Sequence, residues 1–188
     1  MIGSIVQPGP DEQVSGVVQE PSLEEQFESL YDTYYTPIQR YLYYLLRDPQ
    51  QAEDAAQETF LRAWRHLGDL TPNGHTSSWL FRIARNHALD LLRHRALIGW
   101  QSLQDVDGED HGQGQAYRKV EVALLLQQAF DLLPPQHRSV LALWAGERPV
   151  AQMAAILETT AGTARNRLSR ARRVWRHTYA TLSVDNQL

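Results

Sequence analysis

The sequence predicts an all-α protein made of two small helical domains that are joined by a flexible linker. Apolar residues recur at three- and four-residue steps through most of the 188 residues, and no run alternates as a β-strand does. From about Gly99 to Gln115 this pattern gives way to Gln, Asp and Gly, too polar to bury a core. We therefore expect helical domains at 22–98 and 118–182, with a linker at 99–117. An acidic, disordered extension at 1–21 and a tail at 183–188 complete the division.

Composition excludes several classes of protein. The chain contains no Cys, so it has neither disulfides nor thiolate metal sites. No apolar run reaches the roughly 20 residues that span a bilayer, and the first twenty residues lack the basic and apolar regions of a secretion signal. We expect a cytoplasmic protein without membrane insertion. The sequence shows no P-loop, Gly-rich nucleotide fingerprint or HExxH motif, so we expect no enzyme activity, no cofactor and no metal.

Two helices are expected in the first part of the chain. Ser22 and Glu25 form a capping-box pattern for a helix over 22–46, in which Pro37 predicts a kink or a break near Thr36. Asp48 and Pro49 open a second helix that runs to about residue 67. The core face of this second helix is expected to consist of Ala52, Ala56, Phe60, Ala63, Trp64 and Leu67.

The opposite side of the second helix carries a polar cluster. Its members lie one turn apart in pairs: Glu53, Asp54, Gln57 and Glu58. Acidic residues near a helix N-terminus favour the helix dipole and keep a surface soluble. The same cluster equally suits docking of a basic partner, and the pattern alone does not separate the two interpretations.

A third helix is expected at about 77–95, after a loop at 68–78. Leu80, Ala84 and Leu91 follow its buried stripe, which places Arg82, Arg85, Asn86, Arg93 and Arg95 near solvent. Trp79 and Phe81 have two interpretations: they stack on exposed bases, or they belong to the core, as aromatic residues at helical spacing more often do.

The last part of the chain predicts a helix-turn-helix. We expect helices at 120–133, from Pro135 to Gly146 with Trp144 buried, at 150–157 and at about 161–182. Thr160 is placed to cap the last helix and to bring its N-terminus to a phosphate. Its outward residues are Thr163, Arg165, Asn166, Arg170 and Arg173.

Charge is strongly segregated, although the net charge is only -4. Residues 163–176 carry six Arg and no acid, and 79–95 carry four Arg against one Asp. Residues 1–30 carry six acids and no base, and 103–111 carry four acids and no base. This segregation is typical of a nucleic-acid binder whose acidic parts lie away from the DNA. Solvated helix faces produce similar charge runs, so the clusters alone fit both interpretations.

Three segments in order resemble the region 2 and region 4 signatures of extracytoplasmic-function (ECF) sigma factors of the sigma-70 family. These segments are 52–64 (AEDAAQETFLRAW), 79–92 (WLFRIARNHALDLL) and 162–173 (GTARNRLSRARR). The resemblance covers about 24–98 and 120–180, with the spacing of the family.

The resemblance implies a role for each surface. Glu53, Asp54, Gln57 and Glu58 would dock on the β′ clamp helices of bacterial core RNA polymerase, whose β subunit is a further expected partner. The minus-ten promoter element would be opened and held by Asn73, His75, Arg82, Arg85, Asn86, Arg93 and Arg95. Duplex minus-thirty-five DNA would be read by Thr160, Thr163, Arg165, Asn166, Arg167, Arg170 and Arg173. A separate anti-sigma factor is the expected inhibitor.

The chain departs from the family pattern at the helix-turn-helix corner. Glu158 and Thr159 stand where Gly and a small apolar residue are common, Ala164 replaces the usual Val, and Val150 replaces an aromatic residue. The alternative hypothesis is a stand-alone helix-turn-helix regulator that binds duplex DNA without polymerase. It accounts for 120–180 but gives no role to the acidic cluster or to the segment at Trp79.

Overall fold

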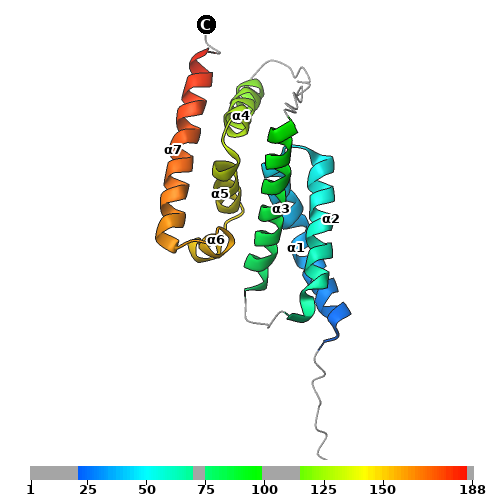
Figure 1. Cartoon of the computed structure of the whole chain (residues 1–188). Helices are drawn as coiled ribbons and strands as arrows, with labels where there is room; N and C mark the ends of the chain where they lie inside the picture. The colour runs from blue at the N-terminus through cyan, green and yellow to red at the C-terminus, as the bar shows by residue number, and fades with distance from the viewer. Residues whose placement is uncertain (1–20, 70–74, 99–114, 186–188) are drawn as a thin grey trace, which may run out of the picture.

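The computed structural model describes residues 21–69, 75–98 and 115–185, and within these ranges the chain is helical without β-strands. The elements are α1 (Leu23–Leu46), α2 (Pro49–Arg65), the 3-10 turn η1 (Leu67–Asp69), α3 (Thr76–Ile98), α4 (Gln115–Asp131), α5 (Pro135–Ala145), α6 (Val150–Ile156) and α7 (Ala161–Asp185). We call α1–α3 the N-terminal bundle and α4–α7 the C-terminal bundle (Figure 1). The prediction of an all-α fold with two helical domains is confirmed.

Helix α1 begins with the predicted capping box. Ser22 Oγ accepts a hydrogen bond from the Glu25 backbone N–H, and the Glu25 carboxylate accepts one from the Ser22 N–H. The predicted break at Pro37 is wrong, because α1 continues through this residue to Leu46. The residues that follow Pro37 explain this: Ile38 and Leu42 are fully buried, so tertiary packing outweighs the missing backbone hydrogen bond.

Helix α2 packs on α1 through small residues and Phe60. Its N-cap is Asp48, whose side chain accepts a hydrogen bond from the Gln51 N–H at 3.0 Å. Ala52, Ala56 and Ala63 are buried as predicted. Trp64 is not part of the core: it is 44% exposed, and its ring lies 5.0 Å from that of Phe27 in an edge-to-face contact.

The C-terminal bundle forms the predicted helix-turn-helix, with α6 and α7 around the corner at residues 157–160. Helix α4 begins at Gln115, five residues before the expected Val120. Trp175 of α7 donates a hydrogen bond to the Leu126 carbonyl oxygen of α4 at 3.1 Å. Trp144 was expected in the core but is 43% exposed. Its ring contacts the Arg172 guanidinium, which lies 4.9 Å from the ring centroid.

The two bundles pack on each other and share one hydrophobic core. Helix α1 contacts α5, and α3 contacts α5 and α6 (Figure 1). A continuous cluster of buried residues runs from Ile38 and Leu42 to Leu143 and Ile156. A buried hydrogen bond of 2.7 Å joins the Tyr41 hydroxyl of α1 to Ser139 of α5. The sequence pattern did not predict this association, because helical periodicity identifies an apolar face without identifying what covers it.

An ion pair closes the rim of the contact between the bundles. Arg47, which ends α1 in the left-handed conformation at φ 57°, places its Nε 2.6 Å from Asp131 of α4. Burial raises the pKa of Asp131, and the nearby Arg47 opposes this rise by favouring the charged carboxylate.

Among the described helices, none is long and apolar enough to cross a membrane.

Replacing Leu42 tests the shared core. Leu42 is fully buried, so Leu42→Ala should lower the free energy of unfolding by about 2–5 kcal/mol in urea denaturation followed by circular dichroism. Leu97→Ala is the matched control, because Leu97 is also helical but 85% exposed, and it should change stability by less than about 0.5 kcal/mol. Equal losses in the two variants would contradict the burial described here.

Candidate nucleic-acid interface

The predicted acidic cluster forms a solvent-facing strip of α2, which we call the acidic face (Glu53, Asp54, Gln57 and Glu58). Glu53, Asp54 and Gln57 are exposed, and Glu58 is half-buried. Glu58 accepts a hydrogen bond of 2.7 Å from Arg62 Nε, and this bond lowers the pKa of the Glu58 carboxyl. The Arg62 contact therefore favours the charged form of Glu58, and the exposed side chains of Glu53, Asp54 and Gln57 are available to a partner.

The acidic face continues into exposed apolar side chains that the sequence analysis missed. Leu61 is 53% exposed and Trp64 is 44% exposed. Both follow Asp54 and Gln57 at the same three- and four-residue steps along α2, so the four side chains share one side of the helix. That spacing was visible in the sequence, but an aromatic residue at a helical position is more often buried. The exposed surface of α2 thus combines negative charge with apolar contact area.

The predicted minus-ten residues on α3 differ in their accessibility. Asn86 and Arg93 are exposed, whereas Arg82, Arg85 and Arg95 are half-buried. His75 is exposed just before the helix, and Asn73 lies outside the described residues.

Each of the four arginines of α3 has an intramolecular partner. Arg93 pairs with Asp90, and Arg85 donates to Asn86 Oδ1 at 3.2 Å. Arg95 is directed toward the end of α1, where its guanidinium lies 3.4 Å from the Leu46 carbonyl oxygen. Arg82 lies 3.8 Å from Glu158, a residue of the C-terminal bundle. DNA binding by these side chains therefore requires exchange of existing contacts.

The two aromatic residues at the start of α3 belong to the packed interior. Phe81 is 3% exposed, its ring lies 5.4 Å from Tyr41, and the Arg148 guanidinium covers it at 4.1 Å. Trp79 is partly buried against the shared core. In this arrangement the core interpretation of both side chains holds, and Phe81 is not accessible for stacking on a base.

Helix α7 presents the predicted basic surface. Thr160, Arg165, Asn166, Arg167, Arg170 and Arg173 are exposed and Thr163 is half-buried. Buried Ala164 and Ala171 fix the opposite side of the helix, which orients the arginines toward solvent. Thr160 caps the helix by accepting a hydrogen bond from the Thr163 N–H at 3.2 Å. This surface suits the phosphates and base edges of duplex DNA.

The helix-turn-helix corner closes although Gly is absent from it. Glu158 has φ 51°, the left-handed conformation that Gly adopts most readily. The Thr159 N–H donates to the Ala154 carbonyl oxygen at 2.9 Å, which completes the end of α6. Val150 is partly buried and Ala164 is 1% exposed, so these two departures from the family pattern fit the core. Glu158 thus keeps the turn and adds a carboxylate at its tip.

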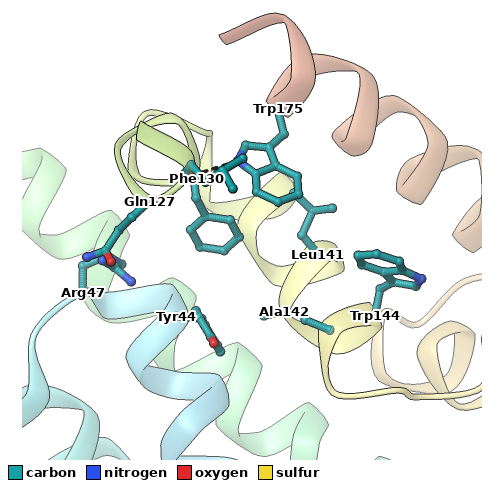
Figure 2. Close-up of a pocket in the computed structure, with 10 residues that line it drawn as sticks. Tyr44, Arg47, Gln127, Phe130, Leu141, Ala142, Trp144 and Trp175 are labelled. Carbon is teal, nitrogen blue, oxygen red and sulfur yellow. Dashed lines mark hydrogen bonds between the residues drawn. The ribbon is translucent and has the colours of Figure 1, made fainter. Parts of the chain in front are cut away.

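A pocket lies at the seam between the bundles, on the side away from the corner. It has a volume of about 260 Å3 and is mostly apolar. Figure 2 shows Tyr44 of α1 and Arg47, the residue that follows α1, on one side of the pocket, and Phe130, Leu141 and Trp175 of the C-terminal bundle on the other. Within the described ranges, no three His, Asp or Glu side chains gather to hold a metal ion.

Comparisons with known proteins match both bundles. The family model described as Sigma-70 region 2 matches residues 30–98, and that described as Sigma-70, region 4 matches residues 123–173.

Three relatives illustrate the similarity. The ECF RNA polymerase sigma factor SigL of Mycobacterium tuberculosis is 34% identical over 167 residues, which are 83% of this chain and 90% of SigL. SigW of Bacillus subtilis is 27% identical over 165 residues, which cover 81% of this chain and 88% of SigW. SigE of Mycolicibacterium smegmatis is 34% identical over 153 residues, which cover 79% of this chain but only 59% of SigE.

Two solved structures share the fold. The sigma factor RpoE of Bartonella quintana, in complex with the anti-sigma factor NepR, aligns with a TM-score of 0.65 at 21% identity, covering 81% of this chain and 96% of that one. CnrH, in complex with the cytosolic domain of CnrY, aligns with a TM-score of 0.61 at 23% identity, covering 86% of this chain and 90% of that one. With two family models matched in order and a relative of similar length at 34% identity, the chain belongs to the ECF group of sigma-70 family RNA polymerase sigma factors.

Proposed function

We propose that this chain binds bacterial core RNA polymerase and directs initiation by reading minus-thirty-five DNA with α7 and opening the minus-ten element with α3. One observation carries the proposal: a single chain combines an exposed acidic face on α2 with an exposed row of arginines on α7. One surface suits a basic protein and the other suits DNA. The function assigned to the chain is binding, and nucleotide addition is left to the polymerase.

The proposed division of labour follows the bundles. Residues 22–98 dock on core and hold minus-ten DNA, 118–182 bind minus-thirty-five DNA, and 99–117 connect them between an extension at 1–21 and a tail at 183–188. The acidic face would contact the β′ clamp helices. A stand-alone helix-turn-helix regulator is not favoured, because it gives no role to the segment that matches Sigma-70 region 2.

Opening of the minus-ten element needs the contacts proposed for α3. Strand separation costs about 1.4 kcal/mol per base-pair step, so the separated strand has to gain contacts to protein. Arg82, Arg85, Asn86, Arg93 and Arg95 supply donors for its phosphates, and His75 with Asn73 adds polar groups at the start of the helix. Because the arginines pair within the chain when DNA is absent, we propose that they exchange these partners for phosphates.

We also propose regulation by a separate anti-sigma protein. The proposal is supported by the structure of the sigma factor RpoE in complex with the anti-sigma factor NepR, and by that of CnrH, which is also bound to a second protein, the cytosolic domain of CnrY.

Transcription with purified components tests the function. The chain, bacterial core polymerase and genomic promoter fragments should yield discrete transcript starts that share a two-part upstream motif. Initiation that stays at the level of core alone, with duplex binding retained, would favour the stand-alone regulator.

Charge reversal on the acidic face tests docking. Asp54→Arg combined with Glu58→Arg should lower core affinity at least a hundredfold, because two attractive contacts become repulsive. Affinity is measured by fluorescence anisotropy of the labelled chain titrated with core polymerase.

The matched control for docking is on α1. Glu28→Arg combined with Asp32→Arg reverses two exposed acids one turn apart, the same charge change on a different face. This control should bind core like the unaltered chain. Equal losses in both variants would show that overall charge matters and would remove the role of the acidic face.

Removal of two arginines from α7 tests the minus-thirty-five surface. Arg165→Ala combined with Arg170→Ala should either reduce the slope of log affinity against log salt by about 0.9 per lost phosphate contact or relax base preference. Affinities of the polymerase complex for promoter duplexes are measured across a salt series. Arg40→Ala combined with Arg65→Ala is the matched control, since it removes equal charge from exposed sites of the N-terminal bundle. An unchanged slope and unchanged preference in the α7 variant would exclude these side chains from the interface.

A further inference from the structure

The contacts between the bundles extend from the α1–α5 core to the start of α3, the helix that the proposed function assigns to minus-ten DNA. Three residues in the first two turns of this helix, Ser77, Phe81 and Arg82, each have a partner in the C-terminal bundle. Arg148 donates to Ser77 Oγ at 2.8 Å and covers the Phe81 ring at 4.1 Å, while Glu158 lies 3.8 Å from Arg82. The C-terminal bundle therefore covers the start of the α3 surface.

Arg148 is held in position to make these contacts. It follows the turn at Gly146 and Glu147 after α5, and its backbone N–H donates to the Leu143 carbonyl oxygen at 3.2 Å. Its guanidinium is half-buried, and this desolvation lowers the pKa of Arg148 from its ordinary value. The hydroxyl of Ser77 and the face of Phe81 offset the lost hydration.

Glu158 has a conformation that is unfavourable for its residue type. Its φ of 51° is strained for a side chain with a Cβ, and Gly would adopt it with less cost. The carboxylate at this position instead approaches Arg82. Both side chains are about half exposed, so the pair is weak and can be broken by a competing phosphate.

The packing around these contacts suits an interface that opens. Besides the pocket of Figure 2, a second pocket of about 260 Å3 lies at the seam, lined by Thr36, Arg40, Tyr41, Phe81, Gly146 and Arg148. Both pockets open to the surface of the seam, so the bundles meet closely at a buried centre and at the polar contacts of Arg148 and Glu158.

We propose that the C-terminal bundle is an intramolecular inhibitor of the minus-ten surface, and that Arg148 and Glu158 form a latch that holds it closed. The proposal rests on the function proposed above. Phe81 does not reach a base while Arg148 covers it, and Arg82 does not bind phosphate while it is paired with Glu158. DNA binding by the start of α3 thus requires separation of the bundles, which docking on core would favour.

The latch lowers the apparent affinity for the minus-ten strand by the fraction of molecules that are open. Weakening the latch raises that fraction, and affinity rises by the same factor without any new contact to DNA. Two variants weaken it independently. Arg148→Ala removes the contacts with Ser77 and Phe81, and Glu158→Gly releases Arg82 while placing at the corner the residue that best fits its conformation.

Single-molecule energy transfer in the full chain measures opening directly. The chain has no Cys, so Asp32→Cys on α1 and His177→Cys on α7, both exposed, carry the dyes in every variant. Arg148→Ala and Glu158→Gly should each lower the ratio of the high-transfer to the low-transfer population at least threefold. Glu147→Gly is the matched control in the same turn, with an exposed side chain and a φ of 55°, and it should match the unaltered chain.

Binding of a strand without polymerase completes the test. The probe is a fluorescent 12-nucleotide non-template strand from a promoter found in the transcription experiment, and unlabelled full-length variants are titrated against it. Both latch variants should bind it at least threefold more tightly than the control.

Two outcomes would overturn the latch: energy transfer equal to that of the control, or opening without a gain in strand affinity. If Arg148→Ala fails to fold, the test rests on Glu158→Gly. This variant is expected to fold, because Gly adopts the left-handed conformation of the turn without strain. Energy transfer is measured without polymerase or DNA, so failure of the latch is distinguishable from failure of the sigma-factor function, which transcription tests.

Discussion

The structure depends on one packing contact, the burial of α1 against α5. Ile38 and Leu42 of α1 lie in the same buried cluster as Val140 and Leu143 of α5. The Tyr41 hydroxyl of α1 forms a buried hydrogen bond with the Ser139 hydroxyl of α5. Burial of Tyr41 raises its pKa to about 12, so the hydroxyl stays protonated and keeps this hydrogen bond across the physiological range. The contact joins two helical bundles into one body and thereby determines which of the proposed DNA-binding side chains are exposed to solvent.

The functional surfaces are affected unequally by this contact. The acidic face of α2 and the arginines of α7 point away from the seam and stay exposed. The start of α3 lies at the seam, with Phe81 buried and Arg82 paired to Glu158. A free chain of this form presents its proposed polymerase-docking and minus-thirty-five surfaces while its minus-ten surface is partly covered. Such an order suits a factor that engages core before it opens DNA, which is the sequence of events that the latch would enforce.

Local features were predictable from the sequence, and associations between distant segments were not. The capping box at Ser22, the N-cap at Asp48 and the helix-turn-helix depend on residues a few positions apart, and the structure contains all three. The periodicity gave a wrong prediction for Trp64 and Trp144. Both have the spacing of a buried stripe, but they lie at its edge, where their neighbours leave them 44% and 43% exposed. The predicted break at Pro37 is absent for the opposite reason: buried neighbours keep the helix intact where the local sequence predicts an end. Glu158 was visible as an unusual corner residue, but its contact with Arg82 joins positions 76 apart in the chain and has no local signature.

Unfolding of the full chain followed separately in each bundle tests most directly whether the two bundles share one core. Fluorine NMR of the chain labelled with 5-fluorotryptophan gives separate signals for Trp79 and Trp175. Trp79 packs against the shared core from α3, and Trp175 is hydrogen-bonded to the Leu126 carbonyl oxygen within the C-terminal bundle. If one core joins the bundles, both native signals should disappear at the same urea concentration, as in a two-state transition. Loss of the two signals at clearly different concentrations would contradict a shared core and would leave the bundles as independent domains.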